Sequence, residues 1–203
     1  VRTHRNHLHG IHVEDDRKEL RAKALEVWEN ALTLGEKSGF RNCQVTLLAP
    51  TGTIGFMMDC DTTGIEPEMA LVKFKNLSDG GRLKLVSSTV PKALRRLGYD
   101  ESSVRSIMAD IDETGTIETA HDLDPDHLSI FDCAVRPING ARSISAEGHL
   151  LMMAAAQPFL SGAISKTVNV PNEITVEEIE ELYVHAWKLG LKAVALYRDG
   201  CKS

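Results

Sequence analysis

Residues 47–67 read LLAPTGTIGFMMDCDTTGIEP, and the fold is decided around this stretch. Residues 44–48, which overlap the start of this stretch, are β-prone, which is typical of a buried strand. Pro50 cannot donate to a sheet ladder, so the chain has to leave the strand there in a turn. A second turn that contains glycine follows at residues 62–67. This pattern predicts a ligand-binding loop at the end of a strand.

The first turn has the chemistry of an anion-binding loop. It consists of Pro50, Thr51, Gly52 and Thr53. Backbone N–H groups of such a loop can converge on a phosphate, the threonines add hydroxyl donors, and glycine allows close approach. An ordinary turn is the alternative that these residues leave open. A Walker loop is excluded because its Gly-Lys-Ser/Thr ending is absent.

Composition limits the classes of function. The chain has 203 residues, of which 42% are hydrophobic and 26% charged, and no apolar stretch is long enough to span a membrane. The formal net charge of -6 argues against general nucleic-acid binding, which needs concentrated Lys and Arg. The four cysteines lie far apart with no CxxC pair, so we expect reduced thiols in a cytoplasmic protein.

Helical patterns flank the opening stretch. Apolar residues at helical spacing predict an amphipathic helix over residues 15–38, ended by the glycine that follows. Two shorter helices are predicted over residues 91–97 and 103–111. Gly98 suits the end of the first and Asp100 the start of the second. We expect this pair to form a hairpin on the surface.

The C-terminal part has the pattern of a βαβ unit. A strand is predicted over residues 163–170, and a capping box of Thr175 and Glu178 opens a helix that Gly190 ends. A second buried strand is predicted over residues 193–197. Short connections favour parallel strands in an α/β fold, so we expect both strands in one sheet with the strand before the turn. No internal repeat or domain boundary is visible.

Two other groups of residues could form sites, but each has a simpler interpretation. A histidine cluster could hold a metal, although solvated side chains explain it as well; it comprises His4, His7, His9 and His12. Paired methionines could line a cofactor, although core packing is their usual role; they are Met57, Met58, Met152 and Met153.

Cysteines and aspartates could also form sites, and they too have simpler interpretations. Cys60 and Cys133 could be redox-active, but no neighbouring base marks either as activated, so both are interpreted as buried small side chains. Three aspartates resemble a calcium loop without its glycine and distal glutamate, so a turn or helix cap is simpler. They are Asp122, Asp124 and Asp126.

Several ordered blocks resemble one known family. Besides the opening stretch they are GFRNCQVT, ALVKFKNL, VPKALRRLGY, HLSIFDCA, GHLLMMAAAQPFLSGAISKTVNVP and AWKLGLKAVALYRDGCK. Together they resemble the C-terminal part of the catalytic domain of adenosylcobalamin-dependent (class II) ribonucleotide reductases, over essentially all 203 residues. The combination of TGTIGFMMDCDTTGIEP with FDCA and MMAAAQPF is similar to the cobalamin class in particular.

The resemblance implies a fold and an activity. The fold is an α/β barrel of ten strands in two parallel halves, of which residues 1–203 are a C-terminal portion. The activity is the reduction of ribonucleotides to 2′-deoxyribonucleotides for DNA synthesis, by a thiyl radical that adenosylcobalamin (vitamin B12) generates. The family's loop for the substrate phosphates is matched by Pro50, Thr51, Gly52, Thr53 and Ile54.

The resemblance also implies partners and missing parts. The substrate is a ribonucleoside diphosphate or triphosphate, the reductant is thioredoxin-like and acts through a C-terminal tail, and a homodimer is compatible. Neither nucleic acid nor membrane is expected as a partner. The family's Asn-x-Cys-x-Glu motif is absent, and the chain begins with Val1 and ends at Ser203 without the tail. We therefore expect a fragment that has no catalytic residue and is inactive alone.

Two alternatives stay open. The chain could be a non-catalytic nucleotide-binding module that uses only the loop after Pro50. It could also belong to a diiron-dependent (class I) large subunit. That class has two adjacent tyrosines where this chain has Tyr197 alone, which favours the cobalamin class.

Overall fold

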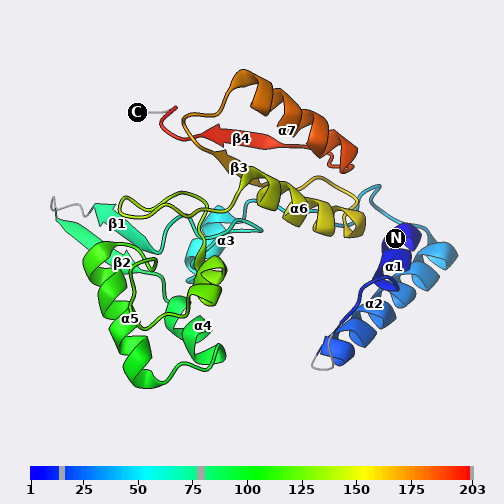
Figure 1. The fold of residues 1–203 in the computed structure, drawn as a ribbon. Coiled ribbons are helices and arrows are strands. Elements are labelled where there is room, and N and C mark those ends of the chain that lie inside the picture. The colour runs from blue at the N-terminus through cyan, green and yellow to red at the C-terminus, as the bar shows by residue number, and fades with distance from the viewer. Residues whose placement is uncertain (14–16, 77–80, 202–203) are drawn as a thin grey trace. The chain divides into compact units, whose positions relative to one another are not determined.

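The structure, a computed structural model, describes residues 1–13, 17–76 and 81–201 (Figure 1). They divide into two compact units. Unit 1 consists of Val1–Pro50, Glu147–Val168 and Glu173–Leu196. Unit 2 consists of Thr51–Ala146, Asn169–Asn172 and the residues from Tyr197 onward. The expectation that residues 1–203 form one portion of a larger barrel, without a domain boundary, stays a prediction.

Two helices begin unit 1. Helix α1 covers Arg2–Leu8 and packs on α2, which covers Lys18–Ser38. The helix predicted over residues 15–38 is confirmed from Lys18 on, and its first residues lie outside the described part. Gly39, with φ 78°, ends α2 as expected. The Phe40 ring then folds back onto Gly35, where an added Cβ would lie 1.9 Å from the ring.

Two further helices of unit 1 follow much later in the chain. Helix α6 covers Ala146–Ala156 and runs into the 3-10 helix η3, Gln157–Phe159, against which α1 packs. Helix α7 covers Val176–Lys188. Its predicted capping box is confirmed: Glu178 N–H donates to Thr175 Oγ1 at 3.2 Å, and Thr175 N–H donates to Glu178 Oε2 at 2.8 Å.

The predicted βαβ unit is present. Strands β3, Thr167–Val170, and β4, Ala195–Arg198, are neighbours in a two-stranded sheet, and α7 lies between them in the chain (Figure 1). Asp199 N–H, just after β4, donates to Val170 O at the end of β3 at 2.9 Å. The C-terminal ends of the two strands therefore meet, which makes the strands parallel. The prediction that the last strand is buried is wrong, because Ala195 and Arg198 are exposed.

The expected single sheet is only partly formed. Residues 44–48 contain no strand, and their sheet contact is one parallel bridge between Leu48 and Ile164. The part of the chain that the structure describes has four strands in two separate sheets and no closed barrel.

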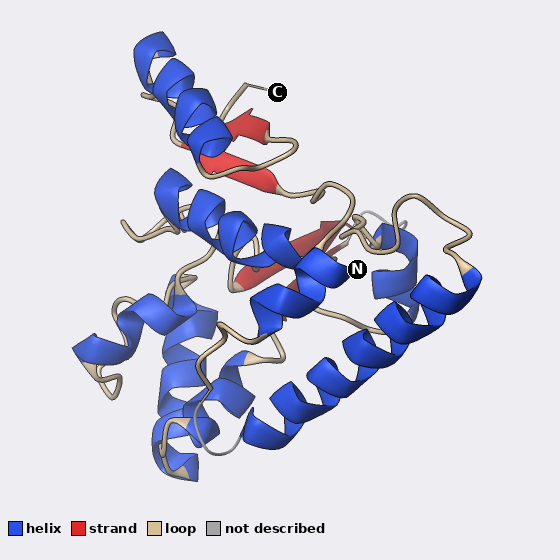
Figure 2. Ribbon diagram, turned by 90° about the vertical axis from the view of Figure 1, so that its right-hand side faces the viewer, coloured by secondary structure: helices blue, strands red, loops and turns tan. Residues whose placement is uncertain are grey.

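Unit 2 contains a β-hairpin that is not among the elements predicted from the sequence. Strands β1, Val72–Asn76, and β2, Arg82–Val86, are among the red arrows of Figure 2. They pair antiparallel, with Val72 opposite Val86. Lysines alternate with apolar residues along both strands, which is the period-2 pattern of strands. Lys73 lies opposite Leu85 and Phe74 lies opposite Lys84, so each face of the hairpin carries both lysine and apolar side chains.

The two predicted helices follow the hairpin. Helix α4 covers Val90–Arg96, and α5 covers Glu101–Thr114. Asp100 is the predicted N-cap of α5, since its carboxylate accepts from the N–H groups of Ser102 and Ser103 at 2.9 and 2.8 Å. The expectation of a surface hairpin is wrong, because the facing sides of these helices form the core of unit 2. Its fully buried side chains are Leu94, Ile107 and Ile111.

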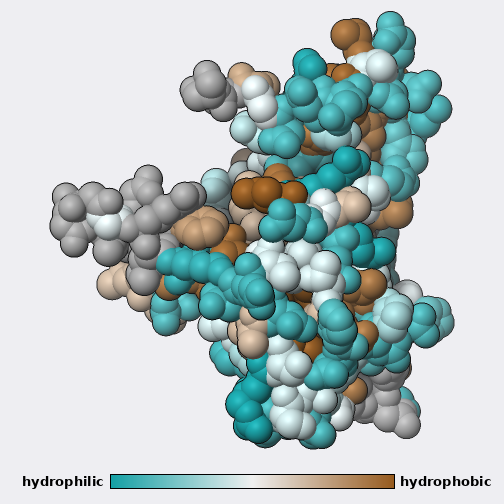
Figure 3. Space-filling model, turned by 60° about the vertical axis from the view of Figure 1, so that its left-hand side comes forward, coloured by the Kyte–Doolittle hydropathy of each residue, from teal (hydrophilic) through white to brown (hydrophobic). Residues whose placement is uncertain are grey.

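The surface is mixed in character. Figure 3 shows hydrophobic side chains scattered among hydrophilic ones on the face that it draws. No helix among the described residues is long and apolar enough to cross a membrane.

Candidate functional site

The candidate loop begins where a short parallel ladder of unit 1 stops. Gly162 N–H donates to Thr46 O at 2.8 Å, and Ser165 N–H donates to Leu48 O at 2.9 Å. The ladder ends two residues before Pro50, whose nitrogen carries no proton to extend it. The strand end and the proline therefore lie in the order that the sequence predicts, although the strand is reduced to one bridge.

A helix begins immediately after Pro50. Helix α3 covers Gly52–Met57 in unit 2, and Gly55 N–H donates to Thr51 O at 2.7 Å. The backbone N–H groups of Gly52, Thr53 and Ile54 precede this first helical bond, so they have no acceptor within the helix. Three consecutive donors at a helix start are suited to bind an anion.

The side chains of this helix start leave it accessible. A Cβ added to Gly52 would meet nothing within 4 Å, and the φ of Gly52 lies outside the left-handed region. Thr53 and Ile54 are exposed, with 66% of Ile54 accessible. A phosphate can therefore approach the backbone N–H groups without displacing a side chain of this unit.

Thr51 has an unusual conformation. Its φ is 51°, in the left-handed region that a β-branched residue rarely adopts, and such a conformation costs about 1–2 kcal/mol. Its Oγ1 accepts a hydrogen bond from Gly64 N–H at 2.6 Å. The hydroxyl proton of Thr51 is left to donate, so this residue can also contact an anion as predicted.

The second glycine-containing turn lies against the first. The TTG turn, Thr62–Thr63–Gly64, supplies the N–H that binds Thr51, and Thr63 Cγ2 would lie 3.0 Å from a Cβ added to Gly55. Gly55 is buried, so the two turns are in direct contact. Both turns are predicted from the sequence, whereas their contact is not. The signal in the sequence for this contact was the small size of the residues in the two turns.

The TTG turn is also fastened on its other side. Lys73 Nζ donates to Asp61 O at 2.9 Å, and Ser88 Oγ donates to Asp61 Oδ2 at 2.7 Å. Because Asp61 directly precedes the TTG turn, these two hydrogen bonds fix the position of the turn relative to the β1–β2 hairpin.

The histidine cluster forms no metal site. The described residues contain no group of three or more His, Cys, Asp or Glu side chains that could hold a metal ion. His4 is half-buried: its Nδ1 lies 2.7 Å from Pro158 O and its Nε2 lies 3.1 Å from Ser161 Oγ. The solvated interpretation is therefore wrong for His4, whereas His7, His9 and His12 are exposed.

The methionine pairs divide between core and surface. Met153 is fully buried, as predicted. The other three are exposed, contrary to the expectation of core packing: Met57 by 85%, Met58 by 69% and Met152 by 57%. Adjacent residues of a helix point in different directions, so only one of the pair on α6 can face inward.

The aspartate cluster is a helix cap. Asp124 is the N-cap of the 3-10 helix η2, Pro125–Phe131, and its Oδ1 accepts from Asp126 N–H at 3.0 Å. The interpretation as a cap around Pro125 is confirmed.

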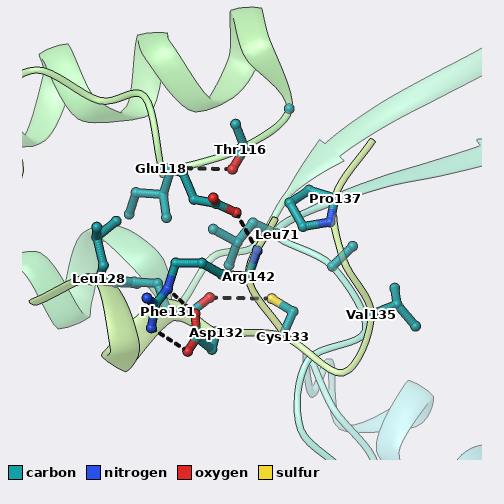
Figure 4. A pocket seen from close by; sticks show the side chains of 13 residues that line it. Leu71, Thr116, Glu118, Leu128, Phe131, Asp132, Cys133, Val135, Pro137 and Arg142 are labelled. Atoms are coloured by element: carbon teal, nitrogen blue, oxygen red, sulfur yellow. Dashed lines mark hydrogen bonds and ion pairs between the residues drawn. The ribbon is translucent and has the colours of Figure 1, made fainter. Parts of the chain in front are cut away.

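Cys133 lines a small cavity in unit 2 (Figure 4). The cavity volume is about 20 Å³, which is enough for little more than one water molecule. Arg142 donates to both carboxylate oxygens of Asp132 at 2.8 Å, and Glu118 accepts from the N–H groups of Ala141 and Arg142 at 3.0 Å. These polar groups bind each other, so the cavity is a packing feature rather than a ligand site.

A wider cavity of about 380 Å³ shares Cys133 in its wall. Polar side chains of its wall bond to one another: Ser87 Oγ donates to Glu68 Oε2 at 3.1 Å and lies 2.9 Å from Thr89 Oγ1. Glu68 also forms an ion pair with Lys73. We therefore assign no ligand to this cavity.

The cysteines differ in expected reactivity. Cys43, Cys60 and Cys201 are exposed, so the buried interpretation holds for Cys133 and is wrong for Cys60. Burial raises the pKa of the Cys133 thiol to about 12, and the nearby carboxylates of Glu68 and Asp132 add to this shift. At pH 8 only about one Cys133 in ten thousand is the reactive thiolate.

We expect iodoacetamide at pH 8 to alkylate Cys43, Cys60 and Cys201 in the folded chain and to leave Cys133 unmodified. The exposed thiols have access to reagent, whereas Cys133 has neither access nor a thiolate. Peptide mass spectrometry after labelling, with and without denaturant, measures this. Labelling of Cys133 in the native state as fast as the others would show that the unit 2 core is not packed as described.

Comparisons with known proteins identify the family of this chain. Residues 3–197 match the family model described as ribonucleotide reductase, barrel domain. The chain is 60% identical over 181 residues to the vitamin B12-dependent ribonucleotide reductase of Streptantibioticus cattleyicolor, and 57% identical over 189 residues to that of Rhodopirellula baltica. These alignments cover 89% and 93% of this chain but 30% and 18% of the relatives, so the chain spans less than a third of either.

A solved structure has a similar fold. The alpha subunit of the Actinobacillus ureae class Id ribonucleotide reductase is similar, with a TM-score of 0.59 at 18% identity. The match covers 85% of this chain and 31% of that subunit, and at this identity it supports the fold alone. The chain therefore belongs to the ribonucleotide reductase barrel-domain family, as the sequence blocks predict.

Proposed function

We propose that this chain is part of a vitamin B12-dependent ribonucleotide reductase, which converts ribonucleotides to 2′-deoxyribonucleotides for DNA synthesis through a thiyl radical. The observation that carries the proposal is the 55–60% identity to several relatives named for that activity. Because the chain spans only a part of them, the activity is proposed for a longer protein that contains it. The complete ten-stranded barrel belongs to the same proposal.

Within that protein we assign this chain the binding of the substrate phosphates. The loop is formed by Pro50, Thr51, Gly52, Thr53 and Ile54, as the resemblance suggests. Support comes from the three N–H donors at the start of α3, the open space at Gly52 and the exposure of Thr53. A ribonucleoside diphosphate or triphosphate is the ligand whose charge such donors stabilise.

The cofactor is adenosylcobalamin, which supplies the radical when bound. The residues that would bind it are not assigned, and we propose no catalytic residue in this chain because the family's Asn-x-Cys-x-Glu motif is not part of residues 1–203. A thioredoxin-type reductant and a cytoplasmic location belong to the same proposal, and a homodimer is compatible with it.

We expect the longer protein to form dCDP from CDP, or dCTP from CTP, with adenosylcobalamin and a dithiol and without a second subunit. Chromatography of the products with and without the cofactor measures this. Activity that requires a diiron partner and ignores cobalamin would place the protein in class I instead. Nucleotide binding without reduction under any of these conditions would favour the non-catalytic module.

Replacing Thr53 with valine tests the hydroxyl in the loop. Valine keeps the shape and removes a donor, and one hydrogen bond to a charged group contributes about 1.5–3 kcal/mol. We expect the dissociation constant of CDP to rise roughly 10- to 100-fold in calorimetric titration of the longer protein. Thr53→Ser keeps the hydroxyl and should bind nearly as the parent does. Equal affinity of Thr53→Val and Thr53→Ser would remove this side chain from the site.

A further inference from the structure

The contact between the two turns suggests a role for the second. Gly64 N–H donates to Thr51 Oγ1 at 2.6 Å, and this is a long-range bond between the TTG turn and the residue that starts the loop. Thr51 needs such support, because its φ of 51° is unfavourable for a β-branched side chain. The bond therefore stabilises the backbone conformation from which α3 begins.

A second contact sets the distance between the turns. An added Cβ on Gly55 would lie 3.0 Å from Thr63 Cγ2 and 3.7 Å from Thr62 O, so only glycine allows this approach without a shift. Cys60 N–H donates to Gly55 O at 3.0 Å, which closes the segment that joins the turns. Gly55 belongs to α3 itself, so a displacement here moves the helix whose first N–H groups form the candidate loop.

Residues outside the candidate loop hold the TTG turn in place. Asp61 receives one hydrogen bond from Lys73 of β1 and one from Ser88, at 2.9 and 2.7 Å. The contacts therefore run from the hairpin through Asp61 and the TTG turn to Thr51 and Gly55. Lys73, Ser88 and the TTG turn lie outside the candidate loop itself.

We propose that Thr63 and Gly64 are positioning residues: they hold Thr51 and Gly55 so that the N–H groups at the start of α3 converge on the substrate phosphates. This inference rests on the proposed phosphate-binding function of the loop. The hydroxyl of Thr51 accepts from Gly64 and donates to the ligand, and a hydroxyl that accepts a hydrogen bond is the better donor. The contribution of Thr63 is its methyl group, which fills the space next to Gly55.

The test adds a Cβ at Gly55 and then removes the methyl group of Thr63 that this Cβ would meet. In the longer protein, Gly55→Ala should raise the KM for CDP about tenfold with kcat within twofold, because phosphate contacts act on ground state and transition state alike. Alanine favours a helix more than glycine does, so a loss of helix stability would not explain this result. The double variant Gly55→Ala, Thr63→Ser also lacks the Thr63 methyl group Cγ2. Its KM for CDP should return to within about threefold of the parent value.

Two milder substitutions, both at Thr63, test the same contact if the Gly55→Ala protein does not fold. Thr63→Ala removes the methyl group and should raise the KM about threefold, whereas Thr63→Val keeps it and should leave the KM unchanged. A parental KM in folded Gly55→Ala or Thr63→Ala, or no recovery in the double variant, would overturn the proposal. If Gly52→Val weakens binding while these variants do not, only the positioning role fails. If Gly52→Val also has no effect, the phosphate loop itself is refuted.

Discussion

Replacing Gly52 with valine in the longer protein is expected to weaken nucleotide binding by roughly 100-fold or more. A branched side chain at this position would occupy the open space in front of the N–H groups of α3. Loss of one or two hydrogen bonds to a charged phosphate costs about 3 kcal/mol in total, which is more than a hundredfold in the dissociation constant. Titration calorimetry with CDP and with CTP measures the change.

The same position offers its own controls. Nothing lies within 4 Å of the added Cβ, and the φ of Gly52 is accessible to any residue, so the fold should tolerate valine. Gly52→Ala should have a smaller effect than Gly52→Val, because its side chain protrudes less. A folded Gly52→Val protein that binds nucleotide as tightly as the parent would mean that the turn is an ordinary turn.

The second large effect is expected in the core of unit 2. Ile107 lies on α5 and is fully buried among residues of α4 and α5. Ile107→Ala removes buried carbon atoms and leaves a cavity, which should lower the free energy of unfolding of this unit by about 2–5 kcal/mol. Urea unfolding followed by fluorescence or circular dichroism measures the difference.

Two variants separate burial from other causes. Ile107→Val should cost only about 0.5–1.5 kcal/mol, because one methyl group is lost. Ile138→Ala makes the same chemical change at a side chain that is 96% exposed, and it should leave stability within about 0.5 kcal/mol of the parent. Equal losses at Ile107 and Ile138 would contradict the described core.

Features that depend on neighbours in sequence could be predicted. The capping box of Thr175 and Glu178 and the N-cap at Asp100 use hydrogen bonds within four residues, so their pattern is visible in the sequence. The parallel βαβ unit follows from strand, helix and strand with short connections. The β1–β2 hairpin was missed although its alternation of lysine with apolar residues was available as a signal.

Features that depend on contacts across the chain could not be predicted. Whether α4 and α5 lie on the surface or form a core depends on what packs against them, and the sequence analysis had no basis for that choice. Whether Met57 and Met58 are buried or exposed likewise depends on what packs against them.

The candidate site illustrates both cases. The sequence predicts the turn after Pro50 and gives the conformational freedom to Gly52. In the structure Thr51 takes the left-handed φ and Gly52 has an ordinary one. A β-branched residue disfavours that conformation, so only its bond to Gly64, thirteen residues away, explains it.

Hydrogen–deuterium exchange of the longer protein, with and without saturating CDP or CTP, tests the central claim most directly. If the N–H groups of Gly52, Thr53 and Ile54 bind the phosphates, peptides that cover residues 51–58 should exchange more slowly with nucleotide bound. Peptides that cover α5 serve as the reference and should not change. Unchanged exchange over residues 51–58 at full occupancy would contradict the assignment of this loop.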